Sequence, residues 1–179
     1  MGCPLEAYDE LVRKVDAFFT RVLHKYSEHM RCAPGCDDCC RRDLSLYPFE
    51  VEKIVRAALR LEPAARARVL ERSRLAVADD EAACPLLEDG RCLVYDSRPV
   101  ICRSHGLPLL VPDSGELSVC ALNFTRVPEI DGDCVLDLTP VNQVMAVVNS
   151  LVCKQNASDH SRVGVSAALC RALEEGEVT

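Results

Sequence analysis

Eight cysteines in the first two thirds of the chain have the type and spacing of metal ligands. They form two sets, a compact one in the stretch RCAPGCDDCCRRD and a dispersed one further on: Cys32, Cys36, Cys39 and Cys40, then Cys84, Cys92, Cys102 and Cys120. Thiolates are soft, negatively charged ligands, and several of them gathered around one point bind zinc, iron or an iron-sulfur cluster. The two sets therefore predict a thiolate metal centre.

The spacing within the compact set bears on which metal is bound. Cys32-x3-Cys36-x2-Cys39 fits three corners of a cubane, so an iron-sulfur cluster of the [4Fe-4S] type is the favoured cofactor. Zinc is the alternative, because cysteine-only ligation also suits a tetrahedral zinc ion. The same spacing occurs in radical SAM enzymes, but the chain lacks the length and the alternating strands and helices of their barrel, so no radical chemistry is predicted.

Cys39 and Cys40 are neighbours in the sequence, which limits how they can act together. Neighbouring residues in an extended chain point to opposite sides. We therefore expect one of the two thiols to face a first metal, and the other to face a second metal or to pack in the interior.

Other candidate groups are weaker. His105 follows Cys102 by three positions and could complete a mixed site. The four remaining cysteines are not expected to be ligands, and Cys153 and Cys170 are expected to be small core residues. No catalytic residue can be assigned, because the sequence has neither a Ser-His-Asp or Cys-His order nor a glycine-rich phosphate loop.

Composition excludes several classes of function. The chain has 179 residues, the size of one domain over residues 1–179, with 12 cysteines and a net charge of -7. An acidic chain with 4% aromatic residues and no Trp is not expected to bind nucleic acid. No apolar stretch is long enough for a membrane span. The start MGCPLEAYDELV lacks the basic and apolar parts of a signal peptide, so we expect a cytoplasmic protein with reduced thiols rather than disulfides.

Hydrophobic periodicity predicts a mainly helical domain. Apolar residues recur at intervals of three and four in several segments. The helices expected are Leu5–Tyr26, Phe49–Leu59, one that Pro63 opens and that continues to Ala78, a long one that follows an N-cap at Thr139 and extends to Val152, and Val163–Leu173. Pro34-Gly35 interrupts the chain inside the first cysteine set, which predicts a loop there.

Two small hairpins are expected to carry most of the dispersed cysteines. CPLLEDGRCLVY has a turn at Asp89-Gly90, with Cys84 beginning its first strand and Cys92 its second. LPLLVPDSGELSVC repeats the pattern and ends at Cys120, while a helical turn after Arg98-Pro99 carries Cys102. The predicted fold class is thus α+β, mainly α with small β-hairpins around a metal centre, in a single domain.

These motifs, in this order, resemble a known family. Cys84-Pro85-Leu86-Leu87, Gly90-x-Cys92-x-x-Tyr95 and Arg98-Pro99-x-x-Cys102-Arg103 follow the compact set, as in the YkgJ-type cysteine-cluster family, also written CxxCxxCC, of zinc- or iron-chelating domains. The resemblance covers about residues 30–122, although the first gap here is one residue longer. It implies metal chelation by the cysteines. Arg98 and Arg103 belong to the matched motif and are expected to contact the cofactor, because a guanidinium stabilises a negatively charged thiolate centre.

Three functions remain open at this point. The first is a protein that binds a metal ion or cluster, in which the centre is at least structural. The second is a redox enzyme or a SAM-dependent enzyme with an open site on an iron-sulfur cluster, and the third is metal storage or delivery. The sequence predicts no substrate, protein partner or oligomeric state.

Overall fold

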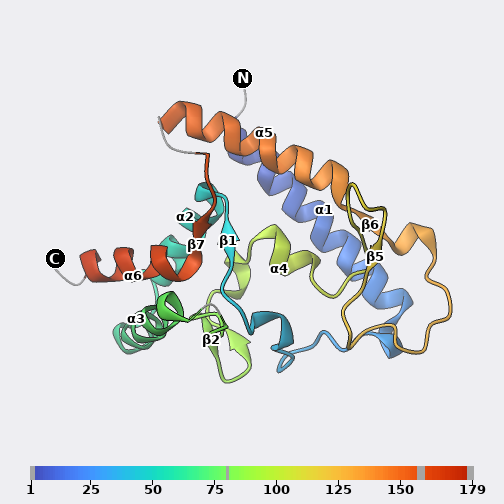
Figure 1. Ribbon diagram of the computed structural model, residues 1–179, viewed down its shortest axis with the longest axis horizontal. Helices are drawn as coiled ribbons and strands as arrows, with labels where there is room; N and C mark the ends of the chain where they lie inside the picture. Colours follow the sequence, from blue (N-terminus) through green and yellow to red (C-terminus); the bar gives the residue numbers. More distant parts are fainter. Residues whose placement is uncertain (1–2, 80, 157–159, 177–179) are drawn as a thin grey trace. The chain divides into compact units, whose positions relative to one another are not determined.

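The computed structural model describes residues 3–79, 81–156 and 160–176, which are mainly helical with a few short strands (Figure 1). This confirms the predicted fold class. The chain divides into two compact units. The first unit is Met1–Ala33 with Val100–Ser158, and the second unit is Pro34–Pro99 with Asp159–Thr179. Each unit has a hydrophobic core of its own. The expectation of one domain over residues 1–179 stays a prediction.

Helices α1 and α5 are the longest elements of the first unit. Its helical segments are α1 (Pro4–Lys25), η1 (Ser27–His29), α4 (Val100–Ser104), η4 (Gly132–Cys134) and α5 (Leu138–Asn156). Tyr8, Leu11, Val15 and Val22 form the buried stripe of α1, as the periodicity predicts. Helix α1 lies alongside α5 and also contacts α4, the helix that carries Cys102 (Figure 1).

A small sheet completes the first unit. Its strands are β4 (Leu109–Leu110), β5 (Leu117–Ser118) and β6 (Leu136–Asp137). Strand β4 pairs antiparallel with β5 and parallel with β6. Asp113 and Gly115, in the connection between β4 and β5, have positive φ angles of 69° and 65°, which confirms the predicted turn. The core beside the sheet consists of Val22, Met30, Leu107, Phe124 and Cys134.

The second unit packs helices around two pairs of very short strands. Its helical segments are η2 (Asp38–Cys40), α2 (Pro48–Ala58), α3 (Pro63–Ala78), η3 (Tyr95–Ser97) and α6 (Val165–Gly176). Its strands are β1 (Ser45–Leu46), β2 (Leu87–Glu88), β3 (Arg91–Cys92) and β7 (Val163–Gly164), with β1 pairing β7 and β2 pairing β3, both antiparallel. Helix α6 contacts both α2 and α3, and Leu46, Ile54, Val69 and Leu169 lie in the core.

Some predicted boundaries are wrong for local reasons. Helix α5 begins at Leu138, one residue before the predicted cap, because the Oδ1 atom of Asp137 accepts the backbone N–H of Thr139 at 2.7 Å. Helix α6 begins at Val165, since Val163 and Gly164 pair with β1 as a strand. The strands of the first hairpin have two residues each, so Cys84 precedes β2 and Cys92 ends β3.

Among the residues that the structure describes, no helix combines the length and the apolar character needed to cross a membrane.

Candidate metal centre

A single 3-10 turn brings two thiols of the second unit together. Residues Asp38–Cys40 form η2, closed by a hydrogen bond from the backbone N–H of Cys40 to the carbonyl of Asp37 at 2.8 Å. The Sγ atoms of Cys39 and Cys40 lie 4.0 Å apart and share a hydrogen bond. The prediction that these thiols point to opposite sides is therefore wrong, because the backbone is helical rather than extended at this point.

The β2–β3 hairpin holds two more thiols of the second unit. Asp89 and Gly90 have φ angles of 50° and 71°, as the predicted tight turn requires. The pairing places Cys92 opposite Leu87, whose backbone N–H is hydrogen-bonded to the carbonyl of Cys84 at 3.0 Å. Cys84 and Cys92 thus both lie at the open end of the hairpin, away from its turn.

Two backbone contacts attach the cysteine loop to this hairpin. The N–H of Cys84 donates to the carbonyl of Cys40 at 2.7 Å. Near the hairpin turn, a Cβ built on Gly90 would lie 3.4 Å from the Cα of Gly35, so the two backbones are in close contact. The segment from Gly35 to Cys40, which also carries Cys36, therefore runs along the hairpin.

Burial keeps these thiols protonated in the absence of metal. It raises the pKa of Cys84 to about 11, with a smaller contribution from the charge of Cys92. Burial also raises the pKa of Cys92, and the charge of Cys39 acts in the same direction. The hydrogen bond to Cys40, together with burial, raises the pKa of Cys39 well above its usual range. These effects make Cys92 an electrostatic neighbour of both Cys84 and Cys39. A cation beside these thiols would favour their deprotonated forms.

Arginines lie near the same thiols. The positive charge of Arg98 counteracts the rise in the pKa of Cys92, and that of Arg72 does the same for Cys84. Arg98 lies over the ring of Tyr95 at 3.5 Å from its centroid, and its Nε atom donates to the Tyr95 carbonyl at 3.0 Å. The guanidinium is thereby fixed close to the hairpin. Whether Arg98 contacts a cofactor stays a prediction.

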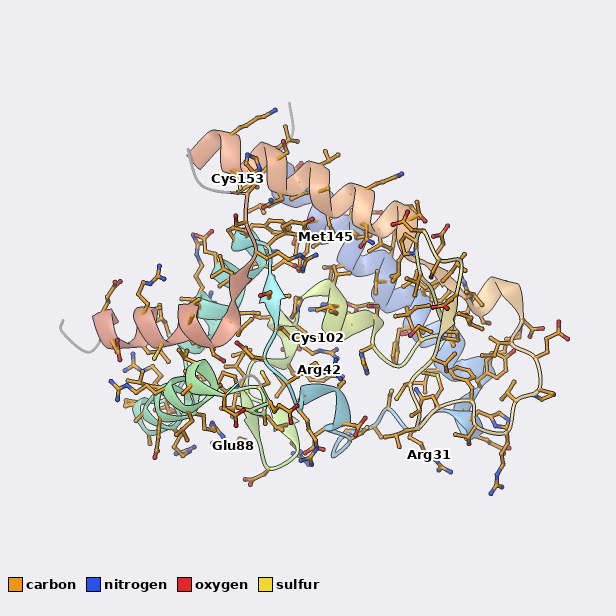
Figure 2. The ribbon with its side chains drawn as sticks, viewed as in Figure 1. Arg31, Arg42, Glu88, Cys102, Met145 and Cys153 are labelled. Carbon is orange, nitrogen blue, oxygen red and sulfur yellow. The ribbon has the colours of Figure 1, made fainter. Side chains whose placement is uncertain are left out.

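Glu88 fastens the hairpin to α3, which the sequence alone did not indicate. Its carboxylate accepts two hydrogen bonds from Arg68 at 2.8 Å and one from Arg72 at 3.1 Å. Figure 2 labels Glu88 on this hairpin. The paired guanidinium groups lower the pKa of Glu88 to about 2. The hairpin that carries Cys92 therefore has an ionic anchor as well as an apolar one.

The other three predicted ligands, Cys32, Cys102 and Cys120, belong to the first unit. Cys102 lies on α4, where Figure 2 labels it. The next residue, Arg103, is 11% exposed, and its Nη1 atom donates to the Oδ2 atom of Asp16 on α1 at 2.6 Å. This ion pair holds α4 against α1, and a cofactor contact by Arg103 stays a prediction. The backbone N–H of His105 continues the helical pattern by donating to Ile101 at 3.1 Å.

The thiol of Cys32 contacts the side chain of Asn123 and the backbone of Gly106. The Nδ2 atom of Asn123 donates to the Sγ atom of Cys32 at 3.3 Å and to the carbonyl of Gly106 at 2.8 Å. Gly106 has a φ angle of 96°, and a Cβ built there would collide with the same sulfur. The backbone N–H of Asn123 also donates to the carbonyl of Cys120 at 2.9 Å. Sequence reasoning missed Asn123; its only signal was the position three residues after Cys120.

The cysteines fit a metal by their chemistry, although their side chains are not yet arranged around one. None of the twelve cysteines, all within the described segments, is joined in a disulfide. All eight predicted ligands are partly buried, as an enclosed centre requires. Within the described residues, however, no three or more His, Cys, Asp or Glu side chains are grouped closely enough to hold a metal ion. The ligand assignments therefore remain predictions.

The remaining cysteines differ in their surroundings. Cys134 is fully buried in the core of the first unit, and Cys153 is fully buried on α5, where Figure 2 labels it. Cys170 packs against the core of the second unit. The expectation that Cys153 is a small core residue is confirmed. The same expectation holds only in part for Cys170, which is half-buried.

Comparison with known proteins gives one match. The family CxxCxxCC, described as "Putative zinc- or iron-chelating domain", matches residues 31–120. The matched range includes all eight predicted ligands. The comparisons with curated proteins and with solved structures found no significant match.

Proposed function

Because the chain belongs to the CxxCxxCC family of zinc- or iron-chelating domains, we propose that its second unit binds one zinc or iron ion through the thiolates of Cys39, Cys40, Cys84 and Cys92. The observation that carries the proposal is the distance of 4.0 Å between the sulfur atoms of Cys39 and Cys40. Cys84 and Cys92 complete a set of four thiols, the number that a tetrahedral site takes.

The sulfur-sulfur distance favours a single ion. With zinc-sulfur bonds of about 2.3 Å, the tetrahedral angle places two sulfur ligands about 3.8 Å apart. Cys39 and Cys40 are within a few tenths of an ångström of that separation. In a [4Fe-4S] cluster each cysteine binds a different iron, so that the sulfur ligands are farther apart than the ligands of one ion. Cys39 and Cys40 are thus better suited to one tetrahedral ion than to two corners of a cubane.

The [4Fe-4S] cluster is the second candidate, and the spacing Cys32-x3-Cys36-x2-Cys39 supports it. Such a cluster would supply electron transfer, or a coordination position for a small molecule if one iron lacks a cysteine ligand. The redox-enzyme, SAM-enzyme and metal-delivery hypotheses all depend on that outcome. A tetrahedral ion with four thiolates favours a structural role instead, because it leaves no open position.

Binding requires the thiols to lose protons and to move. The pKa of Cys84 is raised to about 11, so this thiol is protonated at neutral pH before metal arrives. Metal uptake is then accompanied by proton release, and the apparent affinity rises with pH. The hydrogen bond from Cys84 to Cys40 already joins the loop to the hairpin. Closing the site therefore starts from a loop and a hairpin that are already joined by a backbone hydrogen bond.

Elemental analysis of protein purified without oxygen tests the proposal. We expect about one zinc or iron ion for the second unit and, if the ion is zinc, a colourless protein. A brown protein with about four irons and acid-labile sulfide would favour the cluster over the single ion. Absence of any bound metal, both as purified and after addition of zinc or ferrous iron to the reduced protein, would refute metal binding altogether.

A further inference from the structure

A buried side-chain amide connects the segments of the first unit that carry predicted ligands. Asn123 is 3% exposed. We propose that Asn123 is a positioning residue, which holds the thiol of Cys32 and the turn of Cys120 in place for metal. The inference rests on the metal binding proposed for this family member but goes beyond the site in the second unit: it assigns Cys32 and Cys120 to metal binding in the first unit, with Asn123 as a residue that is not itself a ligand.

The orientation of the amide follows from its partners. The backbone N–H of Arg31 donates to the Oδ1 atom of Asn123 at 2.7 Å, so the oxygen must face that donor. The NH2 group then faces the carbonyl of Gly106 at 2.8 Å and the sulfur of Cys32 at 3.3 Å. An amide has two N–H donors, one for each of these acceptors. All hydrogen-bonding groups of the side chain are therefore used, and one of them is directed at a sulfur atom.

Residues that hydrogen-bond to metal ligands generally orient those ligands, and an N–H group directed at a ligand sulfur has this effect. It fixes the direction of the ligand, and it stabilises the negative charge of the bound thiolate. An amide suits this task because it does not titrate and carries no charge of its own. The contact between Asn123 and Cys32 is therefore a directed hydrogen bond and not only close packing.

The same residue fixes the segment that carries Cys120. The backbone N–H of Asn123 closes a turn by donating to the carbonyl of Cys120 at 2.9 Å. Phe124, which follows, donates its N–H to the carbonyl of His29 at 2.8 Å, and its buried ring packs edge-on against Tyr26. The turn of Cys120 is thereby attached to the segment that leads into Cys32. A shift of Asn123 would move both predicted ligands.

The sulfur of Cys32 packs directly against the backbone of Gly106. A Cβ at this position would collide with that sulfur, and it would lie 3.2 Å from the Nδ2 atom of Asn123. The sulfur thus contacts both the Gly106 backbone and the amide. Gly115, in the same unit, also has a positive φ angle, of 65°, but a Cβ built there has no heavy atom within 4 Å beyond its own chain neighbours.

The test uses Co²⁺ binding to the reduced, metal-free full chain, followed by thiolate-to-cobalt absorption. Asn123→Asp keeps the acceptor for Arg31 and removes the N–H donors. Asn149→Asp is the matched control, because Asn149 is also buried in the first unit and also contacts a cysteine, Cys153, at 3.5 Å. Cys32→Ser defines the part of the absorption that depends on Cys32.

We expect Asn123→Asp to weaken Co²⁺ binding in that Cys32-dependent part by about 10- to 100-fold, and Asn149→Asp to leave it unchanged. Equal effects of the two variants, or none from Asn123→Asp, would overturn the inference while leaving metal binding intact. A wild-type protein without thiolate-cobalt absorption would instead overturn the proposed function.

A second pair of variants covers the case in which Asn123→Asp does not fold. Gly106→Ala should reduce the Cys32-dependent absorption, since the added methyl group displaces the sulfur and crowds the amide. Gly115→Ala also places an alanine at a positive φ angle, without that collision, and should keep the absorption. Full absorption in Gly106→Ala would refute the positioning role.

Discussion

The thiols of the two units are held in different ways. In the second unit the sulfur atoms of Cys39 and Cys40 lie 4.0 Å apart, and the charge of Cys92 raises the pKa of Cys84. In the first unit the sulfur of Cys32 contacts a neutral amide and a glycine backbone. A pair of thiols in contact gains most from a cation, whereas a thiol held by an amide has a defined position before any cation is present. The second unit should therefore respond more strongly to the presence of metal.

The largest expected effect is loss of metal from the second unit when one of its thiols is removed. Cys84→Ser or Cys92→Ser should reduce its metal content from about one ion per chain to nearly none, because a hydroxyl is a poor substitute for a soft thiolate. Elemental analysis after gel filtration measures this. Cys170→Ser, in the same unit but on α6, is the control and should keep the metal. If the Cys84→Ser and Cys92→Ser variants both kept the metal content of the wild type, the two units would not differ in metal binding as described.

The next effect concerns the apolar support of the same thiols. Leu86 is 3% exposed and lies in the core against which Cys84 and Cys92 pack. Leu86→Ala should lower the free energy of unfolding by about 2–5 kcal/mol, owing to lost burial and the cavity left behind. Urea unfolding monitored by circular dichroism gives the value. Leu75→Ala on the surface of α3, where the side chain is 64% exposed, should change stability by less than about 0.5 kcal/mol. Similar losses in both variants would argue against this core as the support of the hairpin.

Metal removal should lower the thermal stability of the protein, and the size of this effect tests whether the second unit holds the ion. At a free metal concentration of about 100 times the dissociation constant, binding adds about 2.7 kcal/mol, equivalent to about 5–10 °C in Tm for a chain of this size. A chelator should therefore lower the Tm of the wild type by that amount and have a smaller effect on Cys84→Ser, which lacks the site in the second unit. The measurement is differential scanning calorimetry. A chelator effect of equal size in Cys84→Ser would mean that the ion binds elsewhere.

The smallest effect is the pH dependence of the hairpin anchor. Arg68 and Arg72 lower the pKa of Glu88 to about 2, whereas the unfolded chain has a value of about 4.3. A lowered carboxyl pKa contributes stability that is complete above about pH 4.3 and is lost as the pH falls toward about 2. The stability difference between the wild type and Glu88→Gln should therefore shrink over that interval. A difference that stays constant from pH 5 to pH 2 would contradict this account.

Sequence patterns predicted the elements of this fold well where one local signal decides the outcome. The apolar stripe of Tyr8, Leu11, Val15 and Val22 is enough to define α1. Asp89-Gly90 is enough to define the first hairpin turn, because few residues adopt its positive φ angles. The prediction failed for η2, since the sequence around Cys39 and Cys40 has no feature that distinguishes a 3-10 turn from an extended loop.

The candidate site was predictable in residue type but not in arrangement. Cysteine spacing identified the thiols, yet the amide of Asn123 contacts Cys32 from 91 positions away in the chain. The contacts of Glu88 with Arg68 and Arg72 likewise join separate elements, and Glu and Arg occur too often on protein surfaces to be singled out from sequence. Such long-range polar contacts depend on the fold as a whole.

The close approach of Gly106 to the sulfur of Cys32 has an evolutionary consequence. A side chain at that position would collide with the thiol where it now lies, and the positive φ angle disfavours other amino acids as well. In homologous sequences we therefore expect the glycine and the cysteine to be inherited together, and a side chain at position 106 to appear only in lineages that have lost the thiol.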